Sequence, residues 1–276
     1  MKIGKTNYLE AKEKSEHGFY LTDESGEEVL LPTAYCPDSL RPGDQIEVFV
    51  YKDSSDRPVA VTGKPLAEAG EFAWMKVTDV NRFGAFVDWG LPKELLVPFA
   101  EQNEKLSEGR DCLIYVLRDE KTNRMIGSAK INRYLQFEDV DLKAGEEVQI
   151  LLHKTGDKGI SAVVNGKYSG LVFHSDIHRN VHPGDKLQAW VKQVRPDGKI
   201  DLSLEPLGYE SSVETHLQNL LEALEAGQGY LPLNDKSSPA EISQNLGMSK
   251  KAFKKAVGKL LRDRRIVMEA DGIRLL

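Results

Sequence analysis

The densest cluster of like charge in this 276-residue chain lies close to its C-terminus. Eight basic residues stand against one acid, Asp263, in the run Lys250, Lys251, Lys254, Lys255, Lys259, Arg262, Arg264 and Arg265. Lys and Arg at this density can contact the phosphates of a polyanion, which gives affinity without reading a base sequence. The alternative is a solvated helix face, the usual role of a charge run. The segment is therefore a candidate nucleic-acid contact.

The sequence offers no comparable arrangement for catalysis. No Ser-His-Asp set, phosphate-binding glycine loop, paired carboxylates or cysteine cluster stands in register with the repeats described below. We therefore predict a protein that is not an enzyme, with no catalytic residues and no cofactor. His174, His178 and His182 have a spacing of four that could bind zinc on a helix. Pro183 interrupts that segment at once, so we predict no metal and assign these histidines to RNA contact or plain surface.

A threefold internal repeat must position most of these residues. Glycines at offsets of 14 and 25 residues occur at Gly4, Gly18 and Gly43, at Gly70, Gly84 and Gly109, and at Gly145, Gly159 and Gly184. The copies are displaced by 66 and then 75 residues, with the extra residues in one place, as expected for a linker. Each copy has room for about five short strands, so each is predicted to be a small domain.

The polarity pattern of one copy predicts a small closed β-barrel. In the second copy, Trp74–Val80 alternates, Gly84 interrupts, and Ala85–Trp89 resumes. A glycine inside a strand pattern marks the sharp bend that small barrels need. Further strands are expected at 95–97, at 112–116 and after a turn at 121–123; in the third copy they are expected at 145–152, 159–164, 168–173, 186–194 and 199–204. Five strands with a longer third connection are typical of an oligonucleotide-binding (OB) barrel.

Two stretches resemble the S1 RNA-binding domain: Phe83-Gly84-Ala85-Phe86-Val87, and 170–176 followed by 191–194 and 197–204. The resemblance covers residues 1 to 207 and is strongest in the second and third copies. It implies single-stranded RNA binding on one barrel face, through two aromatics near the glycine, a histidine after the third strand and basic residues near the last. Carried over by position, it implies RNA contacts at Phe83, Phe86, Phe99, Arg124, Lys158, Phe173, His174, Lys192 and Lys199.

No copy carries the complete S1 set. In the second copy Pro98 replaces the histidine, and in the third Phe173 occupies that position. Phe83 and Phe86 could instead fill the barrel, but strand parity places Phe86 opposite Ala85 and Val87. A further aromatic recurs at Phe49, Tyr115 and Trp190. We favour packing between adjacent barrels for these three residues over base stacking.

Beyond Tyr209 the period becomes helical. One helix is expected from Glu210 to Ala226, a second after the capping box at Ser238, and a third after Ser249; a hairpin of 266–268 and 273–276 follows. Three helices and a two-stranded ribbon predict a winged helix-turn-helix, whose third helix contacts nucleic acid. The predicted contacts are Lys250, Lys251, Lys254, Lys255, Lys259 and Arg262.

The predicted protein is mostly β with a C-terminal α+β module. We expect S1-like OB domains at 1–64, 65–138 and 139–209, and a winged-helix domain at 210–276. The formal charge is −6 overall: −4 over 1–64, −3 over 65–140, 0 over 141–209 and +1 over 210–276. Because an acidic protein repels nucleic acid at long range, binding must come from local basic patches. The first copy is the least suited to RNA.

Composition also bears on cellular location. No apolar run has the length of a membrane span, and no signal peptide is evident. Cys36 and Cys112 occupy different repeats at non-equivalent positions, and Cys112 is expected to be a core thiol. These features predict a cytoplasmic protein that does not contact membranes.

The order of three S1-like barrels and a winged helix resembles the conserved virulence factor B family of bacterial RNA-binding proteins. That resemblance implies a cytoplasmic regulator that binds single-stranded RNA and acts after transcription, with duplex nucleic acid as a further partner of the winged helix. One alternative is a DNA-binding transcription factor. Another is a protein-interaction adaptor associated with the ribosome or the RNA-degradation machinery. The sequence predicts no particular protein partner.

Overall fold

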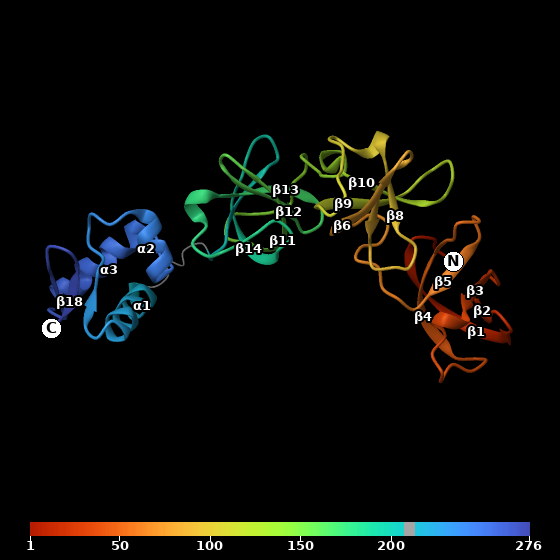
Figure 1. Ribbon diagram of the computed structural model, residues 1–276, viewed down its shortest axis with the longest axis horizontal. Helices are drawn as coiled ribbons and strands as arrows, with labels where there is room; N and C mark the ends of the chain where they lie inside the picture. The colour runs from red at the N-terminus through yellow and green to blue at the C-terminus, as the bar shows by residue number, and fades with distance from the viewer. Residues whose placement is uncertain (207–212) are drawn as a thin grey trace. The chain divides into compact units, whose positions relative to one another are not determined.

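The computed structural model describes residues 1–206 and 213–276. It divides into two compact units, Met1–Leu135 and Gln136–Leu276. Along the chain, three five-stranded barrels precede a helical module (Figure 1). The predicted fold class, tandem OB-like barrels followed by a winged helix, is confirmed. The predicted domain boundaries after residues 64 and 138 stay predictions, and the boundary after residue 209 lies outside the described residues.

The first and third barrels are closed. The first contains β1 (Lys5–Ser15), β2 (Gly18–Thr22), β3 (Glu28–Pro32), β4 (Gln45–Lys52) and β5 (Pro58–Val61), in the order β1-β2-β3-β5-β4. The third contains β11 (Glu147–Gly156), β12 (Gly159–Val164), β13 (Tyr168–Phe173), β14 (Lys186–Val194) and β15 (Ile200–Ser203), in the order β11-β12-β13-β15-β14. The bounds of β12, β13 and β14 agree with the sequence prediction. Alternating side chains fill each interior, as the period of two requires.

The second barrel departs from the prediction because its sheet is not closed by hydrogen bonds. It contains β6 (Phe72–Asn81), β7 (Gly84–Asp88), β8 (Leu95–Pro98), β9 (Asp111–Arg118) and β10 (Met125–Ser128), in the order β10-β9-β6-β7-β8. No ladder joins β8 to β10 in this described part of the chain. Both strands have only four residues, and the side chain of Val97 occupies the space beside Gly127. A side-chain contact therefore replaces the backbone ladder at this seam.

The middle glycine of each repeat has one physical role. A Cβ atom added at Gly18, Gly84 or Gly159 would lie 2.0, 2.3 or 2.0 Å from a backbone carbonyl oxygen of the neighbouring strand. Gly18 and Gly84 also have φ values of 141° and 150°, which favour glycine. The repeated glycine therefore allows two strands to approach closely at the barrel corner, as expected from its position inside a strand pattern.

We expect Gly84→Ala to destabilise the second barrel by about 1–3 kcal/mol, because the new methyl group must displace backbone. Gly109→Ala is the matched control, since Gly109 has a φ of 77° and nothing lies within 4 Å of its added Cβ atom. That control retains only the cost of the backbone conformation, about 1 kcal/mol. Urea denaturation of both variants measures the difference. Equal destabilisation would contradict the role assigned to Gly84.

The first two barrels pack on each other within one unit. The ring of Phe49 meets that of Trp89 edge-on at 5.6 Å, and Tyr51 meets Trp89 at 6.1 Å. Phe49, Tyr51 and Val61 belong to the same buried cluster as the core of the second barrel. The packing expected for Phe49 is therefore confirmed, and Trp89 from the second barrel is its partner.

The other two repeated aromatics behave differently. Tyr115 stacks on Tyr134 with ring centroids 3.9 Å apart and also contacts Phe72 at 4.8 Å. Its partners lie within its own repeat, so it does not join adjacent barrels. Trp190 is half-buried and has no ring partner among the described residues. Of the three positions, only Phe49 joins neighbouring barrels in the described contacts.

The C-terminal module is a winged helix. It contains α1 (Val213–Ala226), β16 (Tyr230–Leu231), α2 (Pro239–Leu246), α3 (Lys250–Arg262), β17 (Ile266–Met268) and β18 (Ile273–Leu275). The predicted start of the first helix at Glu210 lies outside the described residues. The ribbon has three strands in the order β16-β18-β17, so the two-stranded prediction was wrong. Two-residue β16 pairs only through Tyr230 and Leu231, which is too short for a sequence pattern.

The predicted helix caps are confirmed. Ser238 and Glu241 form a reciprocal capping box on either side of Pro239, and Gly247 ends α2 with a left-handed φ of 61°. The Ser249 side chain accepts a hydrogen bond from the Ala252 backbone N–H and begins α3. These short-range signals fix where α3 begins, and its apolar side packs against α1 and α2.

Burial affects two titratable side chains of the barrels. His153 is the extra residue at a bulge of β11, and burial lowers its pKa to about 4, with Lys154 adding to the effect. Burial raises the pKa of the Cys112 thiol to about 11, consistent with its place against the core of the second barrel. In the described residues no helix is both long and apolar enough to cross a membrane.

The His153 shift predicts a loss of stability in acid. The unfolded chain takes up this proton from about pH 6.5 downward, whereas the folded barrel takes it up only near its lowered pKa. The free energy of unfolding is therefore highest above the unfolded pKa of His153 and falls as the pH drops from that value toward the folded pKa. The loss is about 2 kcal/mol at pH 5. Urea denaturation at neutral and acid pH tests this. His153→Gln should show a smaller loss, and an unchanged loss would contradict the assignment.

Candidate nucleic-acid interface

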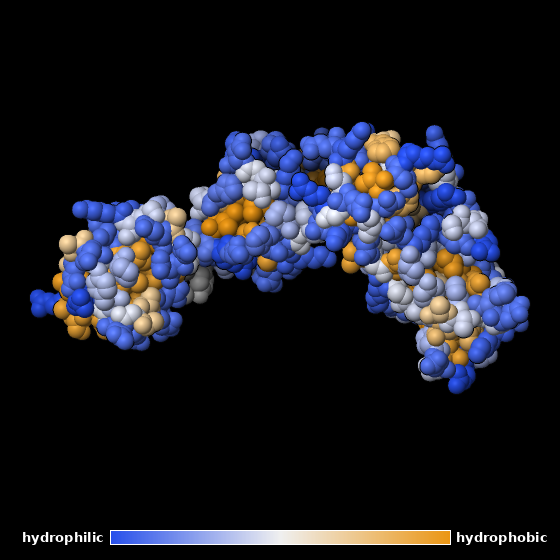
Figure 2. Space-filling model, in the orientation of Figure 1, coloured by the Kyte–Doolittle hydropathy of each residue, from blue (hydrophilic) through white to orange (hydrophobic). Residues whose placement is uncertain are grey.

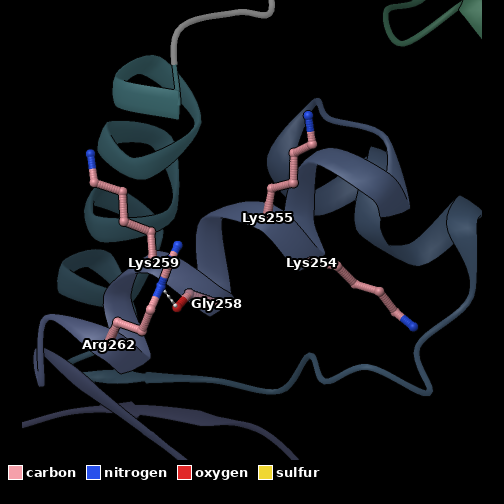
Figure 3. A pocket seen from close by; sticks show the side chains of 5 residues that line it. All are labelled: Lys254, Lys255, Gly258, Lys259 and Arg262. Atoms are coloured by element: carbon pink, nitrogen blue, oxygen red, sulfur yellow. Dashed lines mark hydrogen bonds between the residues drawn. The ribbon is translucent and has the colours of Figure 1, made fainter.

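One face of α3 concentrates positive charge. Phe253, Ala256, Val257 and Leu260 of this helix are buried, so the opposite side faces solvent. Lys254, Lys255, Lys259 and Arg262 extend around Gly258 and line an open depression of about 550 Å³ (Figure 3). In the part of the chain that the structure describes, no carboxylate pairs with Lys254, Lys259 or Arg262. Lys254, Lys259 and Arg262 therefore offer unneutralised cations to a polyanion.

Three further residues of α3 bear on how a ligand could contact it: Gly258, Lys251 and Lys250. Gly258 has nothing within 4 Å of an added Cβ atom, so internal packing does not require a glycine there. A glycine inside a helix costs about 1 kcal/mol relative to alanine, and here its position lets another molecule approach the helix backbone. Lys251 is exposed, whereas the Lys250 ammonium donates a hydrogen bond to the Ser237 carbonyl oxygen at 2.8 Å. Lys250 is therefore partly engaged within the domain.

The second barrel exposes aromatic rings. Phe83 is 57% exposed and Phe99 is 43% exposed, and the Arg82 guanidinium lies 4.8 Å from the centre of the Phe83 ring. Phe86 is half-buried while Ala85 and Val87 are fully buried, so the predicted parity of β7 is confirmed. Hydrophobic side chains reach the surface of this barrel near β8 and β10, with hydrophilic ones around them (Figure 2). Exposed aromatics next to cations suit base stacking.

Arg124, the predicted basic contact of the second barrel, is already paired. Its Nε and Nη2 atoms donate to the two carboxylate oxygens of Asp56 at 2.6 and 2.7 Å. Asp56 belongs to the first barrel, 68 residues away in sequence. This fork lowers the pKa of the Asp56 carboxyl. A nucleic-acid phosphate must therefore compete with Asp56 for Arg124.

The predicted contacts of the third barrel are also largely engaged. Lys192 pairs with Asp176 at 2.8 Å and Lys199 with Asp197 at 3.4 Å. The Arg195 guanidinium covers the Phe173 ring at 5.6 Å, and His174 Nε2 lies 2.8 Å from the Gly156 carbonyl oxygen. Lys158 is exposed, and its ammonium has no hydrogen-bond or ion-pair partner among the described residues. This set is less available to a ligand than the face of α3.

Sequence reasoning missed a cavity of about 270 Å³ between the first two barrels. Tyr51 and Lys52 of the first barrel line it together with Trp89, Lys93 and Arg124 of the second. Burial, and then the nearby Arg124 charge, lowers the pKa of the Lys93 ammonium. No sequence motif contains Lys52 or Lys93. The sequence pointed to this region only through the repeated aromatic position, which predicted that adjacent barrels pack on each other.

Strand order, corner glycines and the winged helix define the class: tandem S1-type barrels followed by a C-terminal winged helix. Residues 218–275 match the CvfB-like winged helix domain, and residues 3–63 match the S1 domain. The S1 match thus falls on the first copy, where the motifs alone were weakest. In the described residues the chain has the domain types that the sequence predicted.

The chain is also similar to named proteins over nearly its whole length. It is 27% identical to uncharacterized protein YitL of Bacillus subtilis, covering 98% of this chain and 92% of that protein. It is 28% identical to conserved virulence factor B of Staphylococcus epidermidis, covering 99% and 94%. A Streptococcus pneumoniae structure, described as a multidomain protein with nucleic acid binding domains, shares 25% identity with a TM-score of 0.45, covering 99% and 98%.

The chain thus has a CvfB-like winged helix domain at its C-terminal end, and it is similar over nearly its whole length to proteins named conserved virulence factor B. Its matched domains are S1 and winged-helix domains, which are nucleic-acid-binding rather than enzymatic types. The site and the comparisons together indicate nucleic-acid binding. The exposed rings of the second barrel and the basic face of α3 are the surfaces best suited to it.

Proposed function

We propose that this protein binds single-stranded RNA without catalysing a reaction, and regulates gene expression after transcription in the bacterial cytoplasm. The observation that carries the proposal is the pairing of two surface types in one chain. Phe83 and Phe86 offer rings to unpaired bases, and Lys254, Lys259 and Arg262 offer cations to phosphates. Stacking needs bases that are free of a duplex, which favours a single strand.

Multivalency supplies affinity that no single surface provides. The formal charge of −6 opposes long-range attraction to RNA, so each local contact is expected to be weak and sensitive to salt. When one strand engages the barrel and then α3, the second contact becomes intramolecular and raises avidity without new interactions. Relatives are named conserved virulence factor B, which refers to virulence, and the regulatory role proposed here rests on the nucleic-acid-binding surfaces of this chain.

A second candidate is duplex nucleic acid bound by α3. This helix is the second of the helix-turn-helix pair α2–α3, which is the element that such proteins place against duplex grooves. A DNA-binding regulator of this kind needs no exposed aromatics on a barrel. Phe83 and Phe86 therefore favour the single-stranded ligand.

Photocrosslinking of RNA to the protein in bacterial cells, followed by mapping of the modified peptides, tests the proposal. We expect crosslinks in the peptides that contain Phe83 and Phe86 and in those from α3. Recovery of protein partners without crosslinked RNA would contradict the proposal and support an adaptor. Crosslinks to DNA confined to α3 would support the duplex candidate instead.

A further inference from the structure

The cavity between the first two barrels joins an apolar surface to a ring of cations. Phe86 on β7 pairs across the sheet with Leu96 on β8, and both point away from the barrel interior. Ile126 on β10 lines the same cavity across the open seam between β8 and β10. Phe83 lies at the same cavity and is more than half exposed. The surface can therefore accept a flat apolar group such as a nucleobase.

Cations from both barrels surround this apolar surface. The Lys52 ammonium donates to the Thr122 carbonyl oxygen at 3.2 Å, and the Lys93 ammonium donates to the Lys52 carbonyl oxygen at 3.1 Å. Within the described residues neither ammonium pairs with a carboxylate. Asp53 and Asp56 act on Lys93 through their charges, and Glu94 also lines the cavity. Two of the three basic side chains at the cavity can therefore receive a phosphate without first losing an acidic partner.

Arg124, the third basic side chain, is held by a carboxylate. Asp56 lies between β4 and β5 with a left-handed φ of 63°, within the hydrogen-bonded turn that Asp53 and Arg57 close. The turn places the Asp56 carboxylate within hydrogen-bond distance of both Arg124 donors, Nε and Nη2. A phosphate oxygen pair matches the same bidentate geometry. Asp56 thus occupies the place that a phosphate would take at Arg124.

We propose that this cavity receives one nucleotide of the bound strand, and that Asp56 acts as a gate that the phosphate displaces from Arg124. This inference rests on the proposed function. The base lies against Phe86 and Leu96, and Lys52, Lys93 and Arg124 contact the phosphate. The volume of about 270 Å³ suits a group of that size rather than an oligomer, being just below the range of about 300–1,000 Å³ for small-molecule pockets. The acidic first barrel thereby contributes to RNA binding.

The gate makes an unusual prediction: removal of a single carboxylate should strengthen binding. The full-length Asp56→Asn protein should bind a fluorescein-labelled single-stranded oligoribonucleotide about two- to five-fold more tightly, the range of one surface ion pair. Asparagine tolerates positive φ, so the turn is retained. Arg124→Gln should weaken binding by a similar factor. In the Arg124→Gln background, Asp56→Asn should strengthen binding no more than a distant loss of one negative charge does, because the gate acts through Arg124.

Two controls separate the gate from simpler effects. Asp38→Asn changes the net charge equally at an exposed site on the first barrel. Glu68→Gln also removes one negative charge, and it loosens another contact between the barrels, since Glu68 accepts hydrogen bonds from Thr6 and pairs with Lys5. Both control variants should change the affinity for RNA only by as much as the loss of one negative charge does. Circular dichroism verifies the fold of each variant.

The outcomes distinguish the two proposals. If Asp56→Asn matches Asp38→Asn, or if it still strengthens binding beyond Asp38→Asn when Arg124 is replaced, the gate is wrong while RNA binding by the protein stands. If Glu68→Gln strengthens binding as much as Asp56→Asn, loosening of the barrels explains the effect and the gate is again overturned. If the wild-type protein does not bind the oligoribonucleotide in dilute buffer, both the gate and the proposed function fail.

Discussion

Reversal of two charges on α3 should weaken RNA binding by roughly 30-fold or more. A unit charge pair 4 Å apart is worth about 1 kcal/mol in water, and the loss of two such contacts corresponds to that factor. Lys254→Glu with Lys259→Glu removes two cations that lack a carboxylate partner in the described residues and introduces repulsion at the same places. Fluorescence anisotropy with a labelled single-stranded RNA at fixed salt measures the change.

The matched control reverses the charge of two lysines in the first and second barrels. Lys14 and Lys105 are exposed and have no acidic partner in the described part of the chain. Lys14→Glu with Lys105→Glu changes the net charge by the same amount as the α3 variant. We expect this control to lose much less affinity than the α3 variant. A lower salt dependence of binding should accompany the α3 change alone, because fewer phosphates are neutralised. Equal losses would show that net charge, and not the face of α3, governs binding.

Removal of the rings of the second barrel should have the next largest effect. Each stacked base is worth about 1–3 kcal/mol, so Phe83→Ala with Phe86→Ala should weaken binding by roughly 30-fold or more. Phe83 is 57% exposed and Phe86 is half-buried, so the barrel should remain folded. The same anisotropy measurement applies, with a thermal melt to verify folding.

An exposed aromatic outside this surface provides the comparison. Tyr8 on β1 of the first barrel is 71% exposed, so Tyr8→Ala removes an aromatic of similar exposure. We expect little change in affinity for this variant. If Phe83 and Phe86 can be removed without loss of RNA affinity, stacking on the second barrel is excluded and α3 must account for binding.

The sequence predicted the barrels well because their signals are local. Gly159 and the alternation after it placed β12 and β13 to the residue, and the side chains of Ser238 and Ser249 marked the starts of two helices. A corner glycine and a cap each depend on neighbours within a few residues or on a single adjacent strand. Such signals are visible in a single sequence.

The features that were missed depend on distant or very short contacts. The pairing of Arg124 with Asp56 joins residues 68 positions apart, and nothing in either segment indicates it. The open seam of the second barrel depends on how two short strands meet at Val97 and Gly127. Charge counting also treated Lys192 and Lys199 as available, whereas Asp176 and Asp197 pair with them. Residue type therefore indicated the candidate surfaces, but not which of their cations were already engaged.

The most direct test of the account is a competition between single-stranded RNA and duplex DNA of matching sequence for the purified full-length protein. In dilute buffer, with labelled RNA bound, the account predicts that unlabelled RNA displaces the probe at a lower concentration than duplex DNA does. More effective displacement by duplex DNA, or no RNA binding at all, would contradict it.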